Sequence, residues 1–321
     1  MTRAVLLAIT VAGCTSFDDP TIVADMRPLA MTAEPPEQLV VLDPANPPAP
    51  TELLMQLQPT RVCALVVDPE MQRRVRYELR ICTDAGGDRC GNPSAQIATG
   101  IIDDPDTTSP APELCATIAP DGNLLGVLLR LLENDAFSGL SGLDYNVVLR
   151  FGGETADPAL DQYASKHVRV APKIPVARTP NVNPTLRRLE AEVDDNGDSR
   201  PLQIGRCVDQ TSPLEVSRGQ RVNISPVETE DAREPYLTPT LDGRGAMFVE
   251  SLTYQWLASA GSFSNAATGG PRDAFGNVQP IDTEWRAPVD IRETTDVDIY
   301  LVQRDERLGA TWYTTCVRVR I

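Results

Sequence analysis

The stretch RRVRYELRIC (Arg73–Cys82) alternates charged and apolar side chains. Its apolar positions fall on one face of an extended chain and are Val75, Tyr77, Leu79 and Ile81. Successive side chains of a β-strand point to opposite faces, so this pattern indicates a half-buried strand. A strand of this kind belongs to an antiparallel sheet that packs on a core with one face only.

The same two-residue period recurs along the rest of the chain. Further examples are NVVLRF (146–151), HVRV (167–170), SLTYQW (251–256), DVDIYL (296–301) and CVRVRI (316–321). Turn-forming stretches separate such runs, among them DAGGD (84–88), DDNGD (194–198) and SRGQ (217–220). Many short strands with this punctuation predict an all-β protein built from β-sandwiches.

Composition sets the number of domains and excludes one class of partner. With 321 residues, of which 41% are hydrophobic, the chain can fill about two domain cores. The formal net charge of −16 repels phosphate backbones, so we expect no nucleic-acid partner. The sole histidine, His167, shares its strand face with Arg169 and is expected to face solvent.

One segment departs from the strand pattern, and another marks a domain boundary. NLLGVLLRLLENDAF (123–137) places leucines at helical spacing, which predicts a short helix over the end of the first domain. The proline-rich segment 171–188 lacks a clear period and reads as a linker. We therefore predict a first β-sandwich at 25–175 and a second at 180–321.

The first residues, MTRAVLLAITVAGC, combine one positive charge with a short apolar run. The run covers residues 4–12, whereas about 20 residues are needed to span a bilayer. A charged start, an apolar stretch and small residues before a cut are typical of a signal peptide. We predict a signal peptide at 1–13 and a tether at 14–24; the alternative is a buried N-terminal strand or helix.

The stretch VAGC (Val11–Cys14) resembles the lipobox of bacterial lipoprotein signal peptides. The resemblance implies that the Cys14 sulfur carries a diacylglycerol and that its new amino group is acylated, palmitate being a typical chain. Several acyl chains give stable membrane anchoring. Because Thr15 rather than aspartate follows the cysteine, the resemblance implies sorting to the outer membrane, with the membrane face left open.

Four further stretches carry two family resemblances. YQW (254–256), TEWRAP (283–288) and YLVQRDERLG (300–309) resemble bacterial immunoglobulin-like and polycystic-kidney-disease-like repeats. DMRPLAMTAEPPE (25–37) resembles the opening of myxobacterial outer-membrane lipoproteins. Together they imply two tandem immunoglobulin-like β-sandwich domains, with a short helical insertion in the first and no assigned activity.

Seven cysteines leave an even number once Cys14 is assigned to the anchor. Six cysteines allow fifteen pairings, and free buried thiols are the alternative. Cys82 is expected to face outward at a strand end, which favours a loop staple Cys82–Cys90. Cys207 and Cys316 are the cysteines of the second domain and are expected to pair as an edge staple. By elimination, Cys63 pairs with Cys115, as suits an oxidising compartment.

The sequence offers only weak candidates for catalytic or metal-binding residues. A serine-hydrolase triad would have to use His167, and no phosphate-binding or GxSxG motif is present. Asp194, Asn196 and Asp198 alternate as at the start of an EF-hand loop, so they are weak calcium candidates. Glycine stands at position 205, where that loop would supply its bidentate glutamate, and a polar hairpin tip is the alternative. We expect no other cofactor.

These observations favour a non-enzymatic, lipid-anchored envelope protein that acts as a binding, adhesion or scaffolding module. Its partners would be the membrane, through Cys14, and an envelope protein or polysaccharide that the sequence does not identify. Two alternatives stay open. One is an envelope carbohydrate-active hydrolase that uses an acidic pair. The other is an accessory subunit of a secretion or motility complex.

Overall fold

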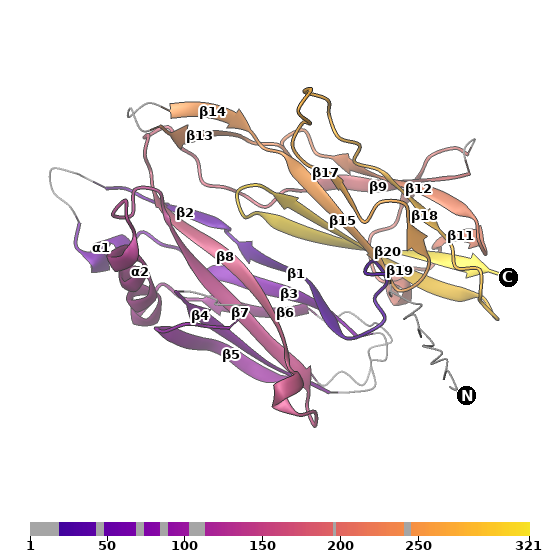
Figure 1. Cartoon of the computed structure of the whole chain (residues 1–321), viewed down its shortest axis with the longest axis horizontal. Coiled ribbons are helices and arrows are strands. Elements are labelled where there is room, and N and C mark those ends of the chain that lie inside the picture. Colours follow the sequence, from indigo (N-terminus) through magenta and orange to yellow (C-terminus); the bar gives the residue numbers. More distant parts are fainter. Residues whose placement is uncertain are drawn as a thin grey trace, which may run out of the picture.

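The computed structural model describes residues 19–42, 48–68, 74–83, 89–102, 113–194, 197–240 and 245–321. Within these ranges the chain is mostly β, and four larger sheets lie one on another (Figure 1). Three apolar layers separate the four sheets. The prediction of an all-β fold is thus confirmed, whereas the division into two domains stays a prediction.

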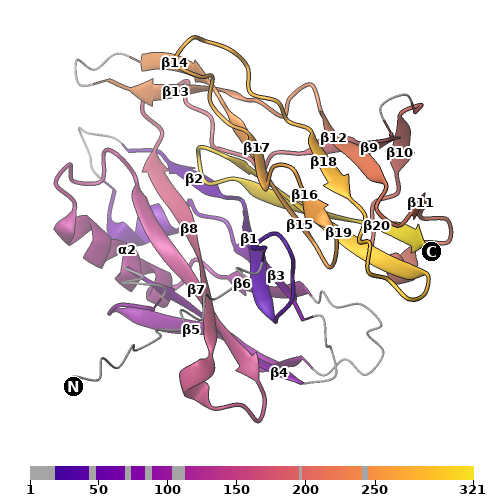
Figure 2. The same cartoon turned by 45° about the vertical axis from the view of Figure 1, so that its right-hand side comes forward.

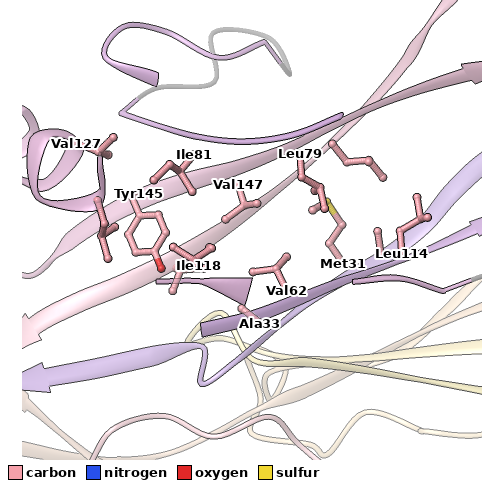
Figure 3. Packing of buried hydrophobic residues seen from close by; sticks show 14 of the residues in the cluster. Met31, Ala33, Val62, Leu79, Ile81, Leu114, Ile118, Val127, Tyr145 and Val147 are labelled. Carbon is pink, nitrogen blue, oxygen red and sulfur yellow. The ribbon is translucent and has the colours of Figure 1, made fainter. Parts of the chain in front are cut away.

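The N-terminal sandwich consists of two sheets. One sheet has the strand order β1 (Arg27–Glu34), β3 (Thr60–Val67), β6 (Glu113–Ile118). The other has the order β2 (Glu37–Val40), β8 (Gln162–Pro172), β7 (Leu143–Gly153), β4 (Val75–Cys82), β5 (Ser94–Ile102). Figure 3 shows Leu79, Ile81 and Val147 facing Met31 and Val62 across the core between these sheets. The alternating face of the opening stretch therefore forms part of this core.

The C-terminal sandwich also consists of two sheets, each with five strands. Its outer sheet has the order β10 (Arg200–Leu202), β9 (Leu186–Val193), β12 (Arg221–Glu228), β18 (Thr283–Arg286), β16 (Ser262–Phe263). Its inner sheet has the order β11 (Leu214–Ser217), β20 (Ala310–Arg320), β19 (Thr295–Asp305), β15 (Leu252–Ala258), β17 (Ala267–Gly269). Trp256 and Trp285 lie fully buried between the two sheets. A separate hairpin pairs β13 (Pro235–Pro239) with β14 (Gly245–Val249).

A third apolar layer joins the two sandwiches. Leu65 and Val67 of β3 pack with Tyr300 and Val302 of β19, and Trp312 of β20 packs against this layer. The views in Figures 1 and 2 place β1 and β3 between β7–β8 and β19–β20. Strands β3 and β19 are therefore buried on both faces, although antiparallel strands of a sandwich commonly expose one.

Two short helices cover one end of the N-terminal sandwich. Helix α2 (Gly122–Asn134) confirms the predicted leucine-rich helix, and the Asp121 carboxylate accepts hydrogen bonds from the backbone of Asn123 and Leu124. Helix α1 (Pro50–Leu54) was not predicted; Pro50 occupies its first turn, where a proline is tolerated. Two 3₁₀ turns complete the elements, η1 (Pro158–Leu160) and η2 (Cys207–Asp209). No helix of the described residues is long and apolar enough to cross a membrane.

The structure forms the three disulfides that were expected, Cys63–Cys115, Cys82–Cys90 and Cys207–Cys316. Two details differ from expectation. Cys82 is fully buried at the end of β4, although it was expected on the outward face of the strand. Cys207 lies in η2, and its partner strand β20 runs between β11 and β19, so this bridge is not an edge staple.

The structure bears on two of the expected segments, the linker at 171–188 and the tether at 14–24. Strand β8 ends at Pro172 and β9 begins at Leu186, so both strands run into the expected linker 171–188, and the domain boundary there stays a prediction. The end of the expected tether, however, is packed on the C-terminal sandwich. Thr21 and Val23 are buried, and their backbones exchange hydrogen bonds with Ala258 of β15. The chain thus touches the second sandwich before it enters the first.

Candidate functional site at the junction of the sandwiches

The turn between β19 and β20 reaches from the C-terminal sandwich into the N-terminal one. The Asp305 Oδ1 accepts hydrogen bonds from the backbone of Arg307 and Gly309, both at 2.7 Å, and this fixes the turn. A Cβ at Gly309 would lie 2.0 Å from the Asp305 carboxylate, so the close approach requires glycine. The turn presents Arg307 and the carbonyl of Leu308 to the N-terminal sandwich.

Glu37, at the start of β2, accepts a hydrogen bond from Arg307 of this turn. Its side chain is 2% exposed. Oε1 accepts from Arg178 Nη2 at 2.5 Å, and Oε2 accepts from Arg307 Nη2 at 2.7 Å. The backbone N–H of Asn181 donates to Oε2 at 2.8 Å. One buried carboxylate thus holds the first sandwich, the linker and the second sandwich together.

Arg307 also makes contacts within its own sandwich. Its Nη1 donates to Glu250 Oε1 at 3.2 Å. The guanidinium carbon lies 4.8 Å from the centre of the Tyr236 ring, within reach of a cation–π interaction. Because Arg307 is surrounded by acceptors and an aromatic face, its burial is compensated by several partners.

The linker adds hydrogen bonds from asparagine side chains to the same place. The Asn181 Nδ2 donates to Asp305 Oδ2 and to the carbonyl of Arg307, both at 3.0 Å. Asn183 donates to the carbonyl of Ala33 at 2.8 Å and accepts from the backbone of Ala310 at 2.9 Å. The linker therefore ties β1 of the first sandwich to β20 of the second.

We call Glu37, Arg178, Glu234, Glu250, Asp305 and Arg307 the junction cluster; it holds two more carboxylates than guanidinium groups. Burial, reinforced by Asp305 and opposed by Arg307, raises the pKa of Glu250 to about 7. Burial also raises the pKa of Glu234, whose Oε2 is enclosed and has no hydrogen-bond partner among the described residues. Lys166 of β8 donates to the carbonyl of Leu308, and burial lowers its pKa to about 8.

The raised pKa of Glu250 predicts that this residue destabilises the fold as the pH rises. The folded state binds the proton more tightly than the unfolded state, so its contribution is complete below pH 4.5 and is lost as the pH rises through 7. We expect Glu250→Gln, which mimics the protonated form, to match the wild type at pH 4.5. At pH 8 it should be more stable by up to about 3 kcal/mol. Urea unfolding at both pH values measures this difference.

Glu215→Gln is the matched control, because the exposed Glu215 on β11 pairs with Arg320 outside the junction. Its stability relative to the wild type should show no such gain between the two pH values. Equal stability of Glu250→Gln and the wild type at pH 8 would show that Glu250 is not under electrostatic strain.

The residues predicted as sites from the sequence lie elsewhere. Cys14 and Asn196 fall outside the described residues. Asp194 accepts a hydrogen bond from Gln220 at 2.7 Å, and Asp198 is exposed. Among the described residues, no three His, Cys, Asp or Glu side chains are grouped as a metal site. His167 is exposed on β8, as expected.

The junction cluster itself was missed by sequence reasoning. Arg307 and Glu37 are 270 residues apart, and neither belongs to a motif with a characteristic spacing. The continuous apolar run IYLV (299–302) did carry a usable signal, since a strand without alternation is typically buried on both faces. That pattern could have predicted a partner layer beside β19, but not its identity.

Comparisons with known proteins find no matching family model and no matching curated protein. Among solved structures, red sea bream transglutaminase is 9% identical with a TM-score of 0.24, and the match covers 92% of this chain and 31% of that one. The BSP domain of a biofilm associated protein is 7% identical over 96% of this chain and 61% of that one, with a TM-score of 0.24. The C-terminal domain of the Streptococcus pyogenes antigen I/II-family protein AspA is 10% identical over 91% and 99%, with a TM-score of 0.21. Values this low establish neither a shared function nor a shared topology.

Proposed function

We propose that this protein is a non-catalytic binding or adhesion module of a bacterial outer membrane, held by acyl chains on Cys14, with both sandwiches fixed as one rigid arm. The observation that carries the proposal is the junction cluster. Glu37, Arg178 and Arg307 come from both sandwiches and the linker, and all are nearly inaccessible to water. A hinge at this place would break the hydrogen bonds of Glu37 to Arg178 and Arg307. It would also expose the apolar layer between β3 and β19 to water, which is costly.

The start of the described chain supports the anchoring geometry. Val23 is buried in the apolar layer between the sandwiches, and Ile22 bridges Ala258 of β15. The described chain therefore begins beside the inner sheet of the C-terminal sandwich. An anchor at Cys14 would hold the rigid arm from this side and leave the helical end of the N-terminal sandwich away from it (Figure 1).

The raised pKa of the Glu250 carboxyl group does not support a hydrolase that uses an acidic pair. Glu250 is 3% exposed and lies against Arg307 inside the junction. A sugar substrate would need direct contact with both carboxyl groups of such a pair. The raised pKa of Glu250 therefore reflects the packing of the two sandwiches.

Metabolic labelling with radioactive palmitate tests the anchor. Expressed in a Gram-negative host, the full chain is expected to take up label and to fractionate with the outer membrane. Cys14→Ser removes the acceptor sulfur, so the label should be lost. Thr15→Asp is the matched control and should keep the label while the protein moves to the inner membrane. Label retained by Cys14→Ser would refute anchoring at this residue.

A further inference from the structure

A cavity of about 180 Å³ lies under the two helices, at the end of the N-terminal sandwich. Leu54 of α1, Leu128 and Leu132 of α2, and Val170 and Ala171 of β8 contribute to its walls. It borders the apolar core formed by the two sheets of this sandwich. Protein interiors are normally close-packed, so a space of this size between well-ordered elements is unusual.

The walls of the cavity are almost entirely hydrocarbon. Among the described residues, leucine, valine, proline and alanine side chains provide nearly all of the lining, Ser138 supplies a hydroxyl group, and no charged side chain takes part. A water molecule needs two to four polar partners, which these walls do not offer. An apolar cavity of about 150 Å³ is known to stay dry and to bind benzene. The chemistry and the volume therefore select an uncharged apolar occupant.

The cavity opens beside helix α2. Leu129 and Leu132 line it and are 37% and 39% exposed, so its edge reaches the surface. The turn after the helix holds this edge in place: a Cβ at Gly139 would lie 3.1 Å from Leu132 Cδ1, and the φ angle of Gly139 is +82°. A glycine is thus required where the turn supports the leucine.

We propose that this cavity binds a neutral hydrocarbon group of about the size of benzene, supplied by an alkyl chain or an aromatic ring. The inference rests on the proposed binding function and gives its ligand class. The hydrocarbon walls provide the affinity, and the described lining offers no charged partner to an ammonium or carboxylate group. The position at the end far from the described N-terminus leaves the mouth open when the chain is anchored.

Titration of the full chain with benzene tests the proposal. The methyl signals of the lining leucines are expected to shift saturably, with a Kd on the order of 1 mM, and the melting temperature should rise with the same concentration dependence. Hexan-1-ol, which represents an alkyl chain, should compete with benzene. Benzylammonium should bind at least tenfold more weakly, because its charge finds no partner in the walls.

Two variants fill the space from different sides. Ala171→Leu adds methyl groups inside the cavity, and Leu132→Trp blocks its half-exposed edge; each should weaken benzene binding at least tenfold. Val176→Leu, at a highly exposed position outside the cavity, is the control and should bind as the wild type does. A wild type without a saturable response, or filled variants that bind benzene equally well, would overturn the proposal. Palmitate labelling at Cys14 does not depend on this cavity, so the two proposals fail separately.

Discussion

Arg307→Ala is expected to lower the free energy of unfolding by about 3 to 5 kcal/mol at neutral pH, as removal of one partner of a buried ion pair typically does. The substitution removes the guanidinium group that pairs with Glu37 Oε2. The Glu37 carboxylate, which is only 2% exposed, then loses one of its cationic partners. It also removes the cation that opposes the raised pKa of Glu250. Urea unfolding of the variant and the wild type measures the loss.

Arg320→Ala is the matched control for this change. Arg320 pairs with Glu215 through a bidentate contact, but the two side chains are 56% and 44% exposed. Exposed ion pairs contribute at most about 1 kcal/mol, so the control should lose little stability. Equal losses in the two variants would contradict the claim that the junction cluster is an important stabilising contact.

Removal of the Cys207–Cys316 disulfide is expected to have the second large effect. The bridge links residues 109 positions apart, so it restricts the unfolded chain strongly. The double variant Cys207→Ala/Cys316→Ala should lose about 2 to 5 kcal/mol of unfolding free energy. The same denaturation measurement, made without reductant, gives the value.

Cys82→Ala/Cys90→Ala is the comparison, because its bridge links residues only 8 positions apart. The entropy of closing a short loop is smaller, so this variant should lose less stability. If the short bridge contributed more than the long one, contacts of Cys82 in the folded core would dominate over the restriction of the unfolded chain.

Much of the fold was predictable because local pattern and burial agree. Leu79 and Ile81 alternate with charged residues and face the first core, and Tyr254 and Trp256 alternate in the same way and face the second. The leucines of 123–137 follow the helical period, and α2 begins at Gly122 with an aspartate cap. In each case, the spacing of apolar side chains along a few residues was sufficient to predict the type of element and its buried face.

The third apolar layer was not predicted, because it depends on how two sheets meet. The alternation of Val297, Ile299 and Leu301 was recognised as one buried face of β19, whereas Tyr300 and Val302 on the opposite face are buried as well. An uninterrupted apolar run signals such burial but does not name the covering strand. That strand is β3, which lies more than 200 residues earlier in the chain.

The junction cluster was out of reach for a more basic reason. Arginine and glutamate are mostly surface residues, and their burial is decided by partners distant in sequence. Glu37 follows two prolines near the start of the chain, and Arg307 sits in a charged turn, DERLG (305–309), that reads as an ordinary hairpin tip. Only the stacking of the sheets brings the two side chains within 2.7 Å.

Differential scanning calorimetry tests most directly whether the two sandwiches form one unit. The buried layer between β3 and β19 and the junction cluster predict a single transition for the wild type, with equal calorimetric and van't Hoff enthalpies. Arg307→Ala should lower or split that transition. Two separate transitions in the wild type, with a calorimetric enthalpy about twice the van't Hoff value, would show that the sandwiches unfold independently and would contradict the rigid arm.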